Sequence, residues 1–240
     1  MPELPAPLPP GERTVGQVIA ETIRAYGANF WRVLPLGLPI AIVDQLSVHQ
    51  AAGAQMYIYW AATPLFVLAY VRACTIMHGA KPTGTALTVA ILIYLPFPAL
   101  RAIFILPGIA WLALIGMAVP AAMVERLGFR DALVRGRRLG QADYAHSLGS
   151  LAALVLVVGV ADSTLGALLR SQGDNGQRAA VFVADLVLSP MLFLGGALLY
   201  LDQVARVGSS RPQRRSSRDA HLHSPVDPDA AGRSDAQVES

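Results

Sequence analysis

Residues 147–169 read SLGSLAALVLVVGVADSTLGALL, and this stretch decides the fold. Asp162 is its only charged residue. A helix that crosses the roughly 30 Å of bilayer hydrocarbon needs about 20 mostly apolar residues, and only helices or closed barrels satisfy their backbone hydrogen bonds there. The stretch therefore predicts a membrane-spanning helix and, for the chain as a whole, an all-α integral membrane bundle.

The composition of the whole chain agrees with this prediction. Hydrophobic residues make up 54% of the 240 residues and charged residues 15%, against roughly 25% charged in soluble domains. The net charge of +3 raises nucleic acid as a partner, but the basic residues border the apolar segments, as they do beside anionic lipid. We therefore expect the lipid bilayer as the partner, with anionic headgroups at the arginine-rich segments and no nucleic acid.

Six apolar segments are long enough to be candidate spans. The third and fourth are separated only by Pro107-Gly108, which predicts a tight turn. The first is interrupted by Asp44 and His49, so the sequence leaves open whether it crosses fully. The six segments are residues 31–51, 56–77, 85–106, 108–124, 147–169 and 179–201.

The basic residues give these spans a direction. With six spans both chain ends lie on one side, and placing the ends inside puts 16 of the 19 Lys and Arg residues there. Only Arg101, Arg170 and Arg178 then lie outside. Basic residues gather on the cytoplasmic side of membrane proteins, so we predict a multi-pass protein of the cell membrane with cytoplasmic N- and C-termini.

Two further helices are expected at the inner surface of the membrane. Thr14 and Gln17 have the spacing of a capping box at the start of an amphipathic helix over 15–30. A second helix over 130–140 carries several arginines on one face and apolar residues on the other. Helices of this type rest in the headgroup region; the alternative is that both are plain extensions of spans.

These assignments divide the chain into three segments. Residues 1–12 are Pro-rich and do not resemble a signal peptide. Residues 13–206 form the helical membrane domain. Residues 207–240 are mostly Ser, Arg, Pro, Asp and Gly, with too few apolar side chains to offset the entropy of ordering. We therefore expect a disordered cytoplasmic tail.

No motif of a known catalytic or cofactor site occurs in the sequence. It lacks a G-x-S-x-G elbow, a G-x-x-x-x-G-K phosphate loop, an H-E-x-x-H metal pair and a dinucleotide fingerprint. The single cysteine, Cys74, lies in an apolar run, and the five histidines are scattered. We therefore expect no enzyme activity, no cofactor and no metal.

Four charged residues fall inside predicted spans: Arg101, Asp44, Asp162 and Asp185. In the predicted orientation all four lie in the outer half of the membrane. A charge in hydrocarbon is costly, so such residues pair with one another, reach the interface or line water. They form either a buried cluster or the wall of a polar cavity. The alternative is that Arg101 and Asp44 reach the interface, while the other two have hydroxyl or backbone partners.

Small residues recur every four positions in the fifth predicted span, at Gly159, Ser163 and Ala167. Small residues allow helices to approach closely in membranes. This face therefore predicts a packing contact, either within the bundle or between subunits. In the second case the partner is another copy of the chain or a different membrane protein.

A run of motifs links the fourth and fifth predicted spans. It consists of Pro107-Gly108-Ile109, an apolar span, Val124-Glu125-Arg126-Leu127-Gly128-Phe129-Arg130-Asp131-Ala132-Leu133, and Arg137-Arg138-Leu139-Gly140. This run resembles the membrane domain beside some bacterial glycerophosphoryl diester phosphodiesterases, and similar stand-alone, uncharacterised bacterial membrane proteins. The resemblance implies a six-helix membrane domain. It implies no phosphodiesterase activity, because the catalytic barrel is absent, and it carries over no catalytic residue.

The family pattern gives Glu125 an expected role. This residue ends the fourth predicted span, where the chain enters the basic segment. We expect its carboxylate to pair with Arg130 or Arg72. Such a pair would hold the inner-surface helix against the bundle.

Three classes of function remain. The missing catalytic motifs and the basic inner-surface helices favour a non-enzymatic membrane scaffold or accessory protein. The charges and prolines inside the spans favour, second, a transporter or channel component, although no inverted repeat is visible. A membrane-embedded enzyme acting on lipid is the third class, with Asp44, His49 and Asp162 as its only candidate polar groups.

Overall fold

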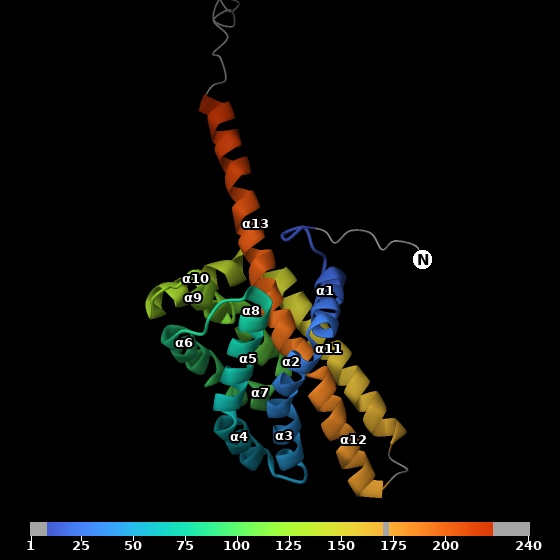
Figure 1. Ribbon diagram of the computed structural model, residues 1–240. Helices are drawn as coiled ribbons and strands as arrows, with labels where there is room; N and C mark the ends of the chain where they lie inside the picture. The colour runs from blue at the N-terminus through green and yellow to red at the C-terminus, as the bar shows by residue number, and fades with distance from the viewer. Residues whose placement is uncertain (1–8, 170–172, 223–240) are drawn as a thin grey trace, which may run out of the picture. The chain divides into compact units, whose positions relative to one another are not determined.

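The protein is all-α, as predicted. The computed structural model (Figure 1) describes residues 9–169 and 173–222, and every regular element in these ranges is a helix. The chain divides into two compact units, residues 1–206 and 207–240. The division falls where the sequence predicts the end of the membrane domain.

The first helix, α1 (Val15–Ala28), begins at the predicted capping box. The Thr14 hydroxyl accepts a hydrogen bond from the backbone N–H of Gln17 at 3.4 Å, and the Gln17 side-chain oxygen accepts one from the backbone N–H of Thr14 at 2.8 Å. Two otherwise free amides at the helix start are thereby satisfied. Val18 and Thr22 are buried on one face of α1, so this helix packs on the bundle through that face.

The first predicted span is not one continuous helix. Residues 30–47 form three short elements: α2 (Phe30–Val33), a 3₁₀ turn η1 (Leu34–Gly37) and α3 (Leu38–Ser47). A proline lies in the first turn of both η1 and α3, where its missing N–H costs nothing. The same prolines interrupt the hydrogen bonding of any longer helix. This segment is therefore not one continuous α-helix, and the sequence left open whether it crosses fully.

The other five predicted spans correspond to long apolar helical segments, as follows. Within the described residues, four segments are long and apolar enough to cross a membrane, and a bent pair makes a fifth if it is one span. The pair is α4 (Ala52–Ala61) and α5 (Thr63–His78), bent by 50°. The four are α6 (Gly84–Tyr94) with α7 (Phe97–Ile103), α8 (Ile105–Ile115) with α9 (Ala118–Val124), α11 (Tyr144–Leu168), and α12 (Gly173–Leu188) with the first part of α13 (Pro190–Leu222).

The turn between the third and fourth predicted spans lies earlier than Pro107-Gly108. The chain is extended only at Phe104, with φ −171° and ψ 157°, and α8 begins at Ile105. Pro107 falls in the first turn of α8, a position that proline favours because its missing N–H has no partner there. The proline therefore marks a helix start and not the turn itself.

The amphipathic helix predicted over 130–140 is α10 (Phe129–Ala142). Its buried residues are Ala132, Gly136, Leu139 and Gly140, which share one face. A Cβ at Gly136 would lie 2.4 Å from the backbone N of Ala118, and one at Gly140 would lie 2.2 Å from the carbonyl of Leu114. Only glycine allows this backbone-to-backbone approach, so α10 packs directly against α8 and α9.

The apolar surface of α11 is largely uncovered by the rest of the first unit. Leu156 is 66% exposed and Leu168 is 71% exposed, and Val160 is also exposed. A helix that is apolar all round is buried in a core or in a bilayer. Exposed apolar surface of this extent on a soluble monomer would be unusual, and it is compatible with a helix that crosses a membrane.

In the second unit, residues 207–222 are the last part of helix α13, and the disorder that the sequence predicts from Val207 stays a prediction. Extending a helix that already exists over residues 190–206 requires no new nucleus, whereas an isolated polar segment must form one. Residues 223–240, the rest of the predicted tail, lie outside the described ranges.

Candidate functional site

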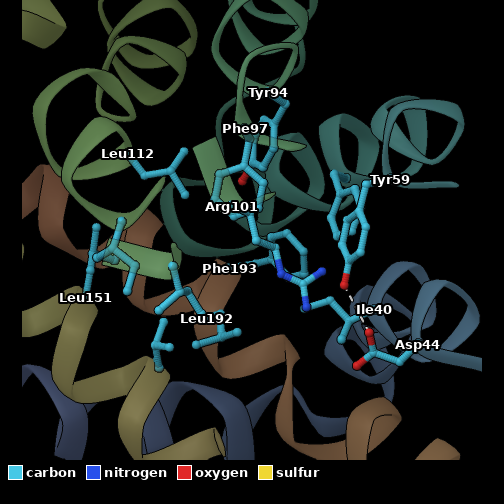
Figure 2. A pocket seen from close by; sticks show the side chains of 14 residues that line it. Ile40, Asp44, Tyr59, Tyr94, Phe97, Arg101, Leu112, Leu151, Leu192 and Phe193 are labelled. Atoms are coloured by element: carbon cyan, nitrogen blue, oxygen red, sulfur yellow. Dashed lines mark hydrogen bonds between the residues drawn. The ribbon is translucent and has the colours of Figure 1, made fainter. Parts of the chain in front are cut away.

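The candidate site is a cavity of about 220 Å³ inside the first unit. Its walls are mostly aliphatic and aromatic, and they come from α3 to α8, α11 and α13. Two charged side chains line it, Asp44 and Arg101. Figure 2 shows them together with Tyr59 at one side, while Leu112, Leu151 and Leu192 lie at the other. The cavity is therefore apolar with one polar end.

At the polar end of the cavity, Arg101 lies against the ring of Tyr59. The guanidinium carbon of Arg101 lies 4.0 Å from the ring centroid of Tyr59, a cation–π contact. The Tyr59 hydroxyl donates a hydrogen bond to Asp44 Oδ1 at 3.0 Å. Arg101 and Asp44 interact electrostatically, yet no ion pair within 4 Å joins them in the described part of the chain. Tyr59 thus separates the opposite charges while it contacts both.

Asp162 and Asp185 lie near this end but outside the cavity. Each interacts electrostatically with Asp44. Asp185 is only 4% exposed, and its Oδ2 has no hydrogen-bond partner among the described residues; the same is true of Asp162 Oδ1. Asp44 therefore interacts electrostatically with each of the other three charges predicted from the sequence, but only Arg101 and Asp44 line the cavity.

A second, smaller cavity of about 40 Å³ adjoins the first. The two share wall residues Tyr94, Leu112, Leu151 and Leu192. Gly116 and Gly196 line the smaller one, so the absence of side chains contributes to this space. The smaller cavity therefore extends the apolar space of the first cavity on the side away from Arg101.

Glu125 pairs with an arginine of α10 other than the predicted one, and its role as an anchor stays a prediction. Its carboxylate accepts two hydrogen bonds from Arg135 Nε, at 2.9 and 3.0 Å, and a third from the hydroxyl of Tyr200 at 3.0 Å. The predicted partners Arg130 and Arg72 are exposed. At about 100° per residue, Arg130 lies on the far side of α10 from the face carrying Gly136, so it points away from the bundle.

Sequence reasoning missed a buried polar network between α11, α13 and the N-terminal segment. Asp202 is fully buried and accepts hydrogen bonds from the backbone N–H of Gly11 at 2.8 Å and from Arg206 Nε at 2.9 Å. His146 Nε2 lies 3.1 Å from Asp202 Oδ2. Arg206 also pairs with Asp143 at 2.8 Å. The only sequence signal was the Asp202–Arg206 spacing of four residues.

The small-residue face of α11 makes no packing contact with the described residues of the first unit. Gly159, Ser163 and Ala167 are all exposed, and a Cβ at Gly159 would meet nothing within 4 Å. The three residues line an open apolar groove together with neighbouring side chains of the same helix. Of the two predicted contacts, the one within the bundle is therefore wrong, and the one between chains stays a prediction.

The described residues contain no group of three or more His, Cys, Asp or Glu side chains placed to hold a metal ion. Comparison of the chain with protein-family models, curated proteins and solved structures gives no match. The resemblance to the phosphodiesterase-associated membrane domain therefore stays a prediction from its motifs.

Proposed function

We propose that this chain is a multi-pass protein of the cell membrane, with both ends in the cytoplasm, that acts as a non-enzymatic scaffold or accessory protein. The observation that carries the membrane location is the apolar surface of α11, which the remainder of the first unit leaves uncovered. The excess of basic residues at one set of helix ends supports the orientation.

The inner face also offers a site for anionic headgroups. Lys81 and Arg126 line an open groove with Thr83 and Thr85 at the ends of α5 and α9. Basic residues at this position attract anionic lipid at about 1 kcal/mol each. This groove and the arginines of α10 support lipid as the principal partner.

Cysteine labelling of intact cells tests the location and the orientation. Asn175 and Arg137 are exposed and are separated by one candidate span, α11. A membrane-impermeant maleimide should label Asn175→Cys in intact cells and Arg137→Cys only after permeabilisation. The native Cys74 is buried and supplies an unreactive background.

Labelling of Arg137→Cys alone in intact cells would mean that the orientation is inverted. Equal labelling of both variants would mean that α11 does not cross the membrane. Release of the chain from membranes by alkaline carbonate would overturn the integral location altogether.

A transporter or channel component is the second candidate, favoured by the position of Asp44 and Arg101 on a cavity wall. Proteoliposomes with an internal pH dye separate the two functions. The scaffold proposal expects proton flux equal to that of empty liposomes. Flux in the wild type that Asp44→Asn removes would favour transport.

A further inference from the structure

We propose that the cavity at Arg101 binds a single-chain amphiphile with an anionic head, a carboxylate or a phosphate. The apolar walls take the hydrocarbon tail, and the guanidinium of Arg101 binds the head. The proposal deepens the proposed function, because it rests on a membrane location that brings such molecules to the protein.

The guanidinium of Arg101 has hydrogen-bond donors that the described part of the chain leaves unused. Arg101 carries five N–H donors, and none makes a hydrogen bond to the described part of the chain; its guanidinium lies against the Tyr59 ring. Arginine in an apolar setting is normally satisfied by carboxylate, phosphate or backbone oxygens. A ligand oxygen in the cavity would supply the missing partner, and Arg matches the planar geometry of an anionic head.

The second argument is the direction from which the head can approach. In Figure 2 the guanidinium lies between Asp44 and Tyr59 on one side and the leucines Leu112, Leu151 and Leu192 on the other. Asp44 Oδ1 is already hydrogen-bonded by Tyr59. An anion that enters from the leucine side meets the positive charge first, with Asp44 behind it.

The third argument is the size of the space. A volume of about 220 Å³ is below the roughly 300–1,000 Å³ of common ligand pockets, but it exceeds the ~150 Å³ that takes benzene in an engineered apolar cavity. The adjoining cavity of about 40 Å³ lengthens it away from Arg101. This volume takes part of one hydrocarbon chain and is too small for a two-chain phospholipid.

A headgroup series on the wild-type protein tests the proposal without any variant. The probes share one dodecyl tail and carry a carboxylate, a phosphate, a hydroxyl or a trimethylammonium head. Native mass spectrometry of the protein in a neutral detergent measures binding of each. We expect the two anionic probes to bind at least about tenfold more tightly than the alcohol, since a charge-assisted hydrogen bond contributes that much, and the cationic probe to bind least.

Variants then assign the effect to named residues. Arg101→Gln should abolish the preference for anionic heads and leave the alcohol unchanged, whereas Arg101→Lys should keep part of it. Ile109→Trp, which fills the cavity, should weaken all four probes. Asp44→Asn should strengthen anionic binding severalfold by removing the competing carboxylate. Arg32→Gln has the same loss of charge at an exposed position outside the cavity and outside α10, and is the matched control.

The proposal is overturned if the wild type binds all four probes with equal affinity. That result would mean that the tail alone drives binding and that the head group is not recognised. It is also overturned if folded Arg101→Gln keeps the anionic preference, or if Arg32→Gln loses it. Because these measurements use purified protein, a failure here leaves the labelling result intact, and inverted labelling leaves the binding result intact.

Discussion

At the scale of single residues, Glu125 is the point where three helices meet. It caps α9, pairs with Arg135 of α10 and accepts a hydrogen bond from Tyr200 of α13. The sequence identified Glu125 but not its partner. The rotation of α10 about its axis decides which of the five arginines from Arg126 to Arg138 faces the bundle. That rotation is set by the packing of Gly136 and Gly140 against α8 and α9.

Removal of either member of the Glu125–Arg135 pair should lower the stability of the protein by a measurable amount. We expect Glu125→Ala and Arg135→Ala each to lower the stability of the purified protein by about 1 kcal/mol, because the pair is partly buried and doubly hydrogen-bonded. Thermal unfolding followed by tryptophan fluorescence measures the loss. Arg130→Ala is the control and should change stability by less than about 0.5 kcal/mol. A larger loss of stability in Arg130→Ala than in Arg135→Ala would mean that Glu125 pairs with Arg130, as the sequence predicts.

Asp202 is the second residue with a large expected effect. It is fully buried and faces two cationic or ionisable side chains and one backbone amide. Loss of one member of a buried charge pair costs about 3–5 kcal/mol, so Asp202→Asn should lower stability by that order. It should also speed tryptic cleavage after Arg13, whose carbonyl accepts a hydrogen bond from Arg206.

Asp174→Asn is the matched control for this measurement, since Asp174 is exposed in the first turn of α12. It should leave both unfolding and cleavage unchanged. Unaltered cleavage at Arg13 in Asp202→Asn would mean that the network does not hold the N-terminal segment.

At the scale of elements, glycines decide which helices touch. We expect Gly140→Ala to destabilise the protein by about 1–3 kcal/mol, because its new methyl group would overlap the carbonyl of Leu114. Gly159→Ala is the control in the interior of α11, where the added carbon meets nothing. It should be neutral or stabilising by about 0.5–1 kcal/mol. Unfolding curves of the two variants in one detergent compare them directly. A large loss from Gly159→Ala would indicate a packing contact at this face, either within the bundle or between chains.

The sequence predicted elements best where the signal was local. The capping box at Thr14 and the apolar run at 147–169 each contain their own physical cause, so α1 and α11 appear where expected. The broken helix at Pro35 and Pro39 and the turn at Phe104 were less visible. Proline starts a helix as readily as it ends one, and neighbouring residues do not say which of the two applies.

At the scale of the whole first unit, hydropathy and charge fixed the class of protein but not its interior. Arg101, Asp44, Asp162 and Asp185 were grouped from depth alone; Asp44 interacts electrostatically with each of the other three, and a cluster of all four stays a prediction. The cavity could not be predicted from the sequence, because its walls come from eight helices. No local sequence pattern encodes the order of these helices around the bundle. The same reason hid Asp202, whose partner Gly11 lies 191 positions earlier in the chain.

That separation between Gly11 and Asp202 has a consequence for biosynthesis. Chains are made from the N-terminus at a finite speed, so Gly11 and Arg13 leave the ribosome long before α13 exists. Until residues 202–206 have been translated and α13 has docked on α11, the N-terminal segment has no carboxylate to bind. Closure of the network is therefore a late event, and an attached N-terminal segment distinguishes a finished molecule from a nascent one.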